Sequence, residues 1–323
     1  MRIAIIGGSG LEDRLSASGL LDAPDAVEVQ TPFGPPSAPI AIGTLTGTDV
    51  QLAILKRHGT GHTIPPHRVP YRANIYALKA LGVTHIAATG AVGSLREEVK
   101  PGGVMLVDQF IDRTSGSGTR GADRTFFDAA AVHVEFADPC CPVMRSWLQA
   151  AAPRLAGGVN EKGGEGIEVY PDGTYICIDG PAFSTRAESE MHRAFGADVV
   201  GMTALPEARL AREAEIAYSL IALPTDYDCW KQRIPKLGQP PESLLLEIIG
   251  NLHTSAGAAA QLIEAALRDV SMLRDHPSPA HDALKLGIWT KKDLIPAAEV
   301  ERLRPIWGRY FPALPAQNHE GHP

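Results

Sequence analysis

Residues 217–230 read AYSLIALPTDYDCW. The apolar first half, 217–223, is typical of a buried strand, and two carboxylates, Asp226 and Asp228, follow just past its carboxyl end. Open α/β sheets bind their ligands at that edge. A carboxyl group shielded from water beside a second one is driven toward holding a proton, which it can donate to a ring nitrogen while its neighbour accepts from an amino group. An isolated pair of this kind is more often a solvated turn, so the rest of the chain has to decide.

Strand-like and helix-like patterns alternate on both sides of this stretch. Apolar runs of strand length lie at 2–6, 39–45, 50–55, 84–89, 103–108, 174–178 and 197–201. Helical patterns lie at 69–81, 184–195, 206–215 and 242–267. The alternation predicts an α/β fold, a central sheet flanked by helices, and the early strands without a helix between them predict that the sheet is mixed. Glycine-rich polar stretches at 115–121 and 157–166 predict loops.

Length and composition indicate one large domain with an appendage. The 323 residues are 44% hydrophobic and 21% charged, which is ordinary for a globular protein with a substantial core. The composition changes near Asp275-His276-Pro277, which reads as a linker. We therefore expect an α/β domain over 1–272 and a C-terminal extension over 273–323.

Charge and cysteine content narrow the function classes. Thirty Lys and Arg residues against 37 Asp and Glu residues give a net charge of −7, so no basic field attracts nucleic acid or an anionic membrane. We expect neither as a partner. No apolar segment reaches the length needed to span a bilayer, and the opening apolar run is too short for a signal peptide. The four cysteines lack zinc-type spacing and two are adjacent, which predicts a reduced, cytoplasmic protein.

Other strand ends carry groups suited to a ligand. Each of these groups, which are named at the end of this paragraph, also has an ordinary structural interpretation. Glycine loops can be tight turns, a basic pair can be exposed on the surface, and a methionine or an aromatic ring can fill the core. Taken together they predict a site for an anion, a sugar and a purine, with no set of metal ligands. The groups are Ser9 in a glycine turn, the basic pair Arg57-His58, the small residues Gly90 and Ala91, Met202 with Thr203, and Phe183.

Nine stretches of the chain resemble a known family. In order they are GGSGL (7–11), TPFGPPS (31–37), RHGTGHTIPPHRVPYRANIYALK (57–79), GSLREEVKPG (93–102), DQFIDRT (108–114), GPAFSTRAES (180–189), GADVVGMT (196–203), PEARLAREA (206–214) and TDYDCW (225–230). In this combination they resemble the 5′-methylthioadenosine phosphorylases, within the purine nucleoside phosphorylase group. The resemblance covers about residues 1–255. It implies a nucleoside phosphorylase fold, a central mixed β-sheet flanked by helices, usually assembled as a homotrimer.

The resemblance also implies a role for individual residues. It assigns phosphate binding to Ser9, Arg57, His58, Thr203 and the backbone at Gly90 and Ala91. It places Met202 against the ribose and Phe183 against the base, with Ser184 and Tyr227 as further substrate contacts. Asp226 corresponds to the catalytic acid beside N7 of the purine, and Asp228 to the carboxylate near its 6-amino group. Leu245 and Ile248 fall in the wall of the 5′-methylthio pocket, His62 near the 5′ end, and His133 at a position that reaches a neighbouring subunit's site.

The implied reaction is phosphate-dependent cleavage of S-methyl-5′-thioadenosine to adenine and 5-methylthioribose 1-phosphate, a pentosyl transfer in purine and methionine salvage. Inorganic phosphate is then a co-substrate, and we expect neither an organic cofactor nor a metal. Two alternatives are open. A phosphorylase for 6-oxopurine nucleosides or methylthioinosine would tend to carry Asn where Asp226 stands. A non-catalytic nucleotide-binding module would leave the two carboxylates without a task.

Overall fold

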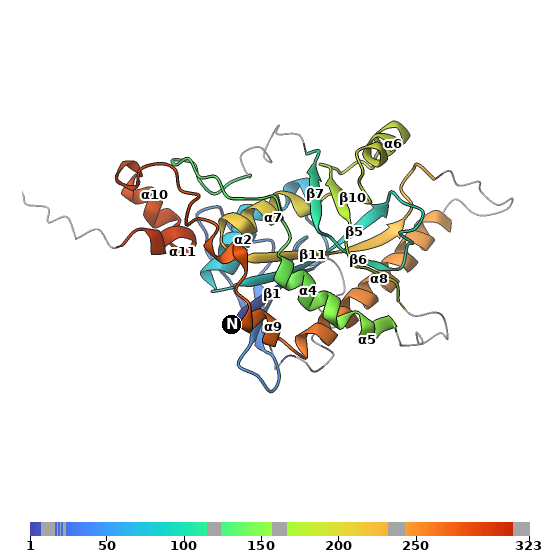
Figure 1. Ribbon diagram of the computed structural model, residues 1–323, viewed down its shortest axis with the longest axis horizontal. Helices are drawn as coiled ribbons and strands as arrows, with labels where there is room; N and C mark the ends of the chain where they lie inside the picture. The colour runs from blue at the N-terminus through green and yellow to red at the C-terminus, as the bar shows by residue number, and fades with distance from the viewer. Residues whose placement is uncertain are drawn as a thin grey trace, which may run out of the picture.

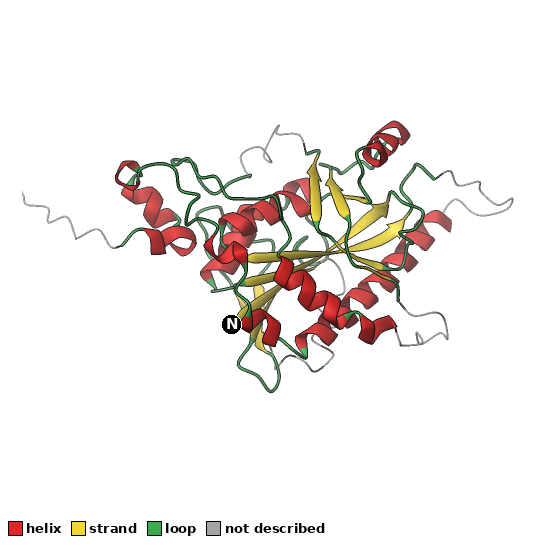
Figure 2. Cartoon of the chain, in the orientation of Figure 1, coloured by secondary structure: helices red, strands yellow, loops and turns green. Residues whose placement is uncertain are grey.

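The computed structural model describes residues 1–7, 17, 19, 21, 24–114, 124–156, 167–231 and 243–312. Within these residues, eleven strands form one mixed sheet (Figures 1 and 2). The predicted central mixed sheet is therefore confirmed. The strands are β1 (Arg2–Gly7), β2 (Asp25–Val27), β3 (Ile40–Thr44), β4 (Gln51–Lys56), β5 (His85–Ser94), β6 (Val104–Leu106), β7 (Gln109–Asp112), β8 (Val169–Tyr170), β9 (Thr174–Cys177), β10 (Val199–Gly201) and β11 (Ala217–Asp226).

The long strand β5 organises the sheet. It pairs in parallel with β1 over its first part and with β11 from His85 to Gly93, and its last two residues pair antiparallel with β10. The main path runs β2-β3-β4-β1-β5-β10-β9-β7, while β11 continues to β6 and β8. The carboxyl ends of β1, β4, β5 and β11 thus point to one edge, because these strands are parallel. This edge is the place predicted for ligands.

Helices cover both faces of the sheet (Figure 2). Helices α2 and α7 pack on one face, and α4 and α8 pack on the other. The helices are α2 (Tyr71–Ala80), α4 (Pro142–Ala151), α5 (Pro153–Ala156), α6 (Arg186–Ala194), α7 (Ala204–Glu213), α8 (Ser243–Leu267), α9 (Ser271–Asp275), α10 (Ala297–Arg302) and α11 (Arg304–Trp307). Short 3-10 turns are η1 (Pro66–Arg68), η2 (Pro279–Asp282), η3 (Lys292–Leu294) and η4 (Gly308–Tyr310).

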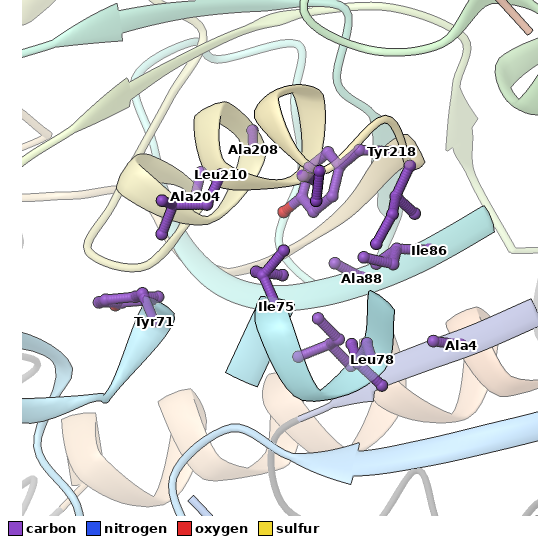
Figure 3. Close-up of a cluster of buried hydrophobic side chains, with 14 of the residues drawn as sticks. Ala4, Tyr71, Ile75, Leu78, Ile86, Ala88, Ala204, Ala208, Leu210 and Tyr218 are labelled. Atoms are coloured by element: carbon purple, nitrogen blue, oxygen red, sulfur yellow. The ribbon is translucent and has the colours of Figure 1, made fainter. Parts of the chain in front are cut away.

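The core has two large hydrophobic clusters, one on each face of the sheet, because side chains alternate along each strand. In β1, Ala4 and Ile6 join the cluster beneath α2 and α7, whereas Ile3 and Ile5 join the one beneath α4 and α8. Figure 3 shows the first cluster, where Ile75 of α2 lies between the sheet and α7. All four of these β1 side chains are at most 1% exposed. A strand buried on both faces reads as a continuous apolar run, as the sequence predicts.

Strand β11 extends beyond its apolar run. It continues through Asp226, with a shift in its pairing to β5 between Pro224 and Asp226. The catalytic candidate is therefore the last residue of the strand and does not lie past it. An irregularity of this kind re-aims the side chains that follow, here those of the two carboxylates.

The C-terminal segment 273–312 packs into the first hydrophobic cluster, to which it contributes the fully buried Trp307 and Leu284. Its charged anchor is Glu215, whose carboxylate accepts from the Leu284 N–H at 2.9 Å and from the Tyr310 hydroxyl at 2.6 Å. Arg309 adds an ion pair to Glu215 at 2.8 Å. The segment shares the core of the α/β layers, and a boundary near residue 272 stays a prediction. The predicted loops at 115–121 and 157–166 lie outside the described residues.

Candidate active site

A cavity of about 340 Å³ opens where the ends of β4, β5, β10 and β11 meet. Most of the residues singled out from the sequence line it, although they come from distant parts of the chain. The predicted residues that line the cavity are Arg57, His58, His62, Gly90, Ala91, Phe183, Ser184, Met202, Thr203, Asp226, Asp228 and Ile248. Ser9 lies outside the described residues.

Arg57 directly follows β4 and is only 1% exposed. Its Nε and Nη2 donate to the two oxygens of Glu207 at 2.7 and 2.8 Å, and its Nη1 donates to the Thr89 carbonyl at 2.6 Å. Glu207 lies on α7 and also accepts from the Tyr218 hydroxyl at 2.9 Å. A guanidinium has five N–H donors, so these bonds leave two for a ligand, as far as the described residues go.

The Arg57 side chain stays positively charged in the folded protein. Burial by itself would lower its pKa, but the adjacent Glu207 carboxylate outweighs burial and raises the pKa above its ordinary value. The side chain is thus a fixed, positively charged donor in a water-poor cavity. Such a group binds an anion more strongly than the same group would in water.

His58 presents an acceptor to the cavity. Its Nδ1 lies 2.8 Å from the Ile64 carbonyl, and because a carbonyl can only accept, Nδ1 carries the proton. Burial lowers the pKa of His58 to about 4, so the ring is neutral near pH 7 and Nε2 is left as an acceptor. The His62 ring stacks on it with centroids 4.3 Å apart. A protonated phosphate oxygen or a sugar hydroxyl fits an acceptor of this kind.

Thr203 and Gly90 bring two strand ends together. Gly90 belongs to β5, and a Cβ placed on it would lie 3.4 Å from the Thr203 hydroxyl. The absence of a side chain at Gly90 therefore keeps the space around that hydroxyl open. Thr203 directly precedes α7 and is 7% exposed. The cavity end near Arg57 thus combines a charge, a hydroxyl and accessible backbone, which is the chemistry of an oxyanion site.

The two carboxylates lie at the other end of the same strand edge. Asp226 Oδ2 accepts from the Thr225 hydroxyl at 2.7 Å. Gly93 of β5 makes room for both acids, since a Cβ there would lie 3.2 Å from Asp228 Cβ and 3.5 Å from Asp226 Oδ1. Asp228 Oδ2 is buried and has no hydrogen-bond partner among the described residues. An unpaired buried oxygen in a cavity wall is a strong site for a donor on a ligand.

An apolar wall closes the cavity on the α8 side. It is formed by Ile248, Leu252, Ala256 and Ala259, which share one face of the helix at steps of three or four residues. Sequence reasoning found only Ile248 of these four, although the same spacing pointed to the others. Met202, another lining residue, lies close against Gly180, whose φ of 64° and lack of a side chain both suit this approach.

Comparison with known proteins agrees with this geometry. The profile of the phosphorylase superfamily matches residues 2–268. The chain belongs to that family.

Relatives and solved structures of this phosphorylase are similar along nearly their whole length. An S-methyl-5′-thioadenosine phosphorylase of Geobacter sulfurreducens is 45% identical, over 95% of this chain and 98% of the relative. One from Gloeobacter violaceus is 44% identical, over 96% of each chain. The crystal structure of a methylthioadenosine phosphorylase from an Antarctic soil metagenomic library has a TM-score of 0.80 at 41% identity, covering 94% of this chain and 98% of that one. The Schistosoma mansoni methylthioadenosine phosphorylase in complex with adenine has a TM-score of 0.74 at 33% identity, with 90% and 100% covered.

Three predicted residues of the phosphorylase are not among the described residues that line the cavity. Leu245 lies one helical turn before Ile248 and is 58% exposed. Tyr227 points its hydroxyl to the Glu97 carbonyl at 3.2 Å. His133 is exposed, and its ring lies 4.5 Å from that of Trp289 in the C-terminal segment. The implied roles of these three residues stay predictions.

Proposed function

We propose that this phosphorylase cleaves S-methyl-5′-thioadenosine with inorganic phosphate and releases adenine and 5-methylthioribose 1-phosphate. The observation that carries this proposal is the pairing of a fixed cation, Arg57, with two carboxylates, Asp226 and Asp228, in one cavity. Cleavage of the N-glycosidic bond builds positive charge on the sugar and negative charge on the purine. The cavity supplies an anion-binding site for the positive charge on the sugar. It supplies hydrogen-bond donors or acceptors for the negative charge on the purine. The names of the similar proteins support the same substrate.

At the phosphate end, the two remaining N–H groups of Arg57 and the Thr203 hydroxyl donate to phosphate oxygens. Backbone groups at Gly90 and Ala91 complete the contact, with Ser9 as the further hydroxyl that the sequence predicts. His58 Nε2 accepts from the protonated oxygen of a monohydrogen phosphate. The phosphate so held is both the nucleophile and the electrostatic partner of the cationic sugar.

At the purine end, Asp226 supplies a proton or a strong hydrogen bond to N7 as negative charge develops there. A general acid of this kind contributes about 10²- to 10⁴-fold to the rate. Asp228 Oδ2, which is buried and unpaired among the described residues, accepts from the 6-amino group. Phe183, 84% exposed at the cavity wall, packs on the base when the site fills.

At the 5′ end, the α8 wall favours a methylthio group over a hydroxyl. A hydroxyl placed against Ile248 and Leu252 loses its hydration without gaining a partner, whereas a methylthio group does not. Discrimination by one such contact amounts to about 1–3 kcal/mol, so adenosine is a slower substrate and not an excluded one. His62, on the rim of the same cavity, lies toward the 5′ side in this orientation.

Phosphate is the co-substrate in this scheme, and none of the steps calls for a metal or an organic cofactor. We also propose a cytoplasmic homotrimer in which His133 reaches a neighbouring site. Supporting this, Leu286 and Trp289 near His133 expose 86% and 68% of their surface, more than side chains of this size usually leave in water. Within the described residues, no helix is both long and apolar enough to cross a membrane.

The function is tested by measuring base release from S-methyl-5′-thioadenosine, adenosine and methylthioinosine, each with and without phosphate. We expect adenine from the first substrate only when phosphate is present, slower release from adenosine, and little from methylthioinosine. Preference for methylthioinosine would favour the 6-oxopurine alternative. Tight nucleoside binding without phosphate-dependent release would favour a binding module.

A further inference from the structure

Helix α6 forms a wall beside the segment that carries Asp228. It begins with a complete capping box, in which Thr185 and Glu188 bond to each other's backbone N–H groups. The Arg193 guanidinium lies 3.9 Å from the Trp230 ring centroid and donates to the Leu95 carbonyl at 3.1 Å. The Cys229 thiol donates to the Ser184 carbonyl at 3.2 Å, which ties the helix entry to the same loop. The helix therefore packs against the segment that carries Asp228.

This wall concentrates polar atoms that have no hydrogen bond. Eight buried side-chain atoms in the described residues lack a partner, and four of them lie here: Ser184 Oγ, Ser189 Oγ, His192 Nδ1 and Asp228 Oδ2. Ser189 and His192 share the buried face of α6 and are 0% and 2% exposed. Buried polar groups are nearly always paired in proteins, so these atoms call for partners that the described side chains do not supply in their present orientation.

His192 lies on the helix that packs against the loop carrying Asp228, within electrostatic range of that carboxylate. Burial is the largest influence on the imidazole and lowers its pKa, so near neutral pH the ring is uncharged and carries a single N–H. The carboxylate can only accept when ionised. Of the two orphaned atoms, Nδ1 is therefore the one that can donate, and Asp228 Oδ2 is the one that can receive.

We propose that His192 is a positioning residue for purine recognition, which donates Nδ1–H to the Asp228 carboxylate directly or through one water molecule. This proposal rests on the proposed function, because it takes the 6-amino group of the purine as the partner of the other Asp228 oxygen. The two side chains are not hydrogen-bonded to each other in this structure, so the contact requires a side-chain rotation or a bridging water. A neutral donor orients the carboxylate without cancelling its charge. Asp228 then attracts a 6-amino group and repels a 6-oxo group.

Two substitutions separate hydrogen bonding from packing. His192→Leu fills similar space without a donor, whereas His192→Asn places an amide N–H near the position of Nδ1. Ser189→Ala is the matched control, because it removes a neighbouring buried hydroxyl from the same helix face. For each variant, kcat and KM are measured with S-methyl-5′-thioadenosine and with methylthioinosine.

We expect H192L to raise KM for S-methyl-5′-thioadenosine by about tenfold, the loss of one hydrogen bond to a charged group, with little change in kcat. Its preference for the 6-amino over the 6-oxo substrate should fall accordingly. H192N should stay close to the wild-type values, and S189A should not change the preference. Wild-type preference in H192L, or equal loss in H192N and H192L, overturns the proposal.

A measurement on the unmodified protein keeps the test open if H192L does not fold. The ¹⁵N shifts of the His192 imidazole with adenine bound report which ring nitrogen holds the proton. Protonated Nδ1 supports the proposal, and a bare Nδ1 overturns it. Failure of the proposed function is seen separately, because the wild-type protein would then release no base with phosphate.

Discussion

Replacing Arg57 tests the anion site, but the structure predicts that the simple alanine variant mainly tests folding. Arg57 and Glu207 are each 1% exposed and 2.7 Å apart. Removing one partner of such a pair strands a buried charge and costs about 3–5 kcal/mol. Whole proteins are stable by only about 5–15 kcal/mol. Arg57→Ala should therefore lower the free energy of unfolding by an amount that can abolish the folded state.

A paired substitution separates the two effects. Arg57→Met combined with Glu207→Gln removes both charges, keeps the side-chain volumes similar, and leaves a Gln oxygen to accept from the Tyr218 hydroxyl. Exchanging a buried ion pair for groups of similar volume is often close to neutral for stability. The double variant nevertheless lacks the two guanidinium N–H groups that face a ligand. Each hydrogen bond to a charged group is worth about 1.5–3 kcal/mol, so KM for phosphate should rise about tenfold or more.

The assays are urea unfolding and the phosphate dependence of adenine release, with S-methyl-5′-thioadenosine saturating. We expect the double variant to unfold near the wild-type midpoint while the single variant unfolds well below it. An unchanged KM for phosphate in the double variant would show that Arg57 is structural and that the anion site lies elsewhere. A single variant as stable as wild type would refute the reasoning about the buried pair.

Much of the fold follows from local patterns in the sequence. Each predicted apolar run overlaps an observed strand, because strands buried on both faces need uninterrupted apolar residues. The predicted helix at 184–195 is observed as α6 (Arg186–Ala194), with its cap at Thr185. The short strands β2, β7 and β8 were not predicted, since two to four residues carry too little periodicity. Helix α4 was not predicted either, although Pro142 at its start is a recognised signal.

The site could be predicted as far as strand ends and their chemistry allow. Residues that line the cavity because a strand ends there, such as Thr203 and Asp226, are visible in the sequence. The partner of Arg57 is not, because Glu207 lies 150 residues away and only the fold brings them together. Leu245 and Ile248 share the same helical spacing, and periodicity alone cannot tell which turns of α8 line the cavity. No sequence pattern indicated a role for His192, because its proximity to Asp228 depends on how α6 packs.

Three further predictions use the same geometry. Asp226→Asn should lower kcat on S-methyl-5′-thioadenosine by about 10² or more with a relative gain for methylthioinosine, and unchanged turnover would reject Asp226 as the acid. Ile248→Ser should reduce the preference for S-methyl-5′-thioadenosine over adenosine by about 10-fold or more, because Ile248 lines the cavity. Leu245→Ser tests the predicted role of Leu245: an equal loss of preference would extend the pocket one turn earlier along α8, and an unchanged preference would end it at Ile248. Glu213 provides a pH prediction: burial raises its pKa from 4.5 to about 7, while it still accepts from the Phe126 N–H at 2.8 Å. Between these pH values the folded state holds a proton that the unfolded state has lost, so this contribution to stability is complete below pH 4.5 and disappears as the pH rises through 7. The stability of the wild type relative to Glu213→Gln should therefore fall by about 3 kcal/mol across that window, and a pH-independent difference in unfolding free energy would show that Glu213 is ionised in the folded protein throughout.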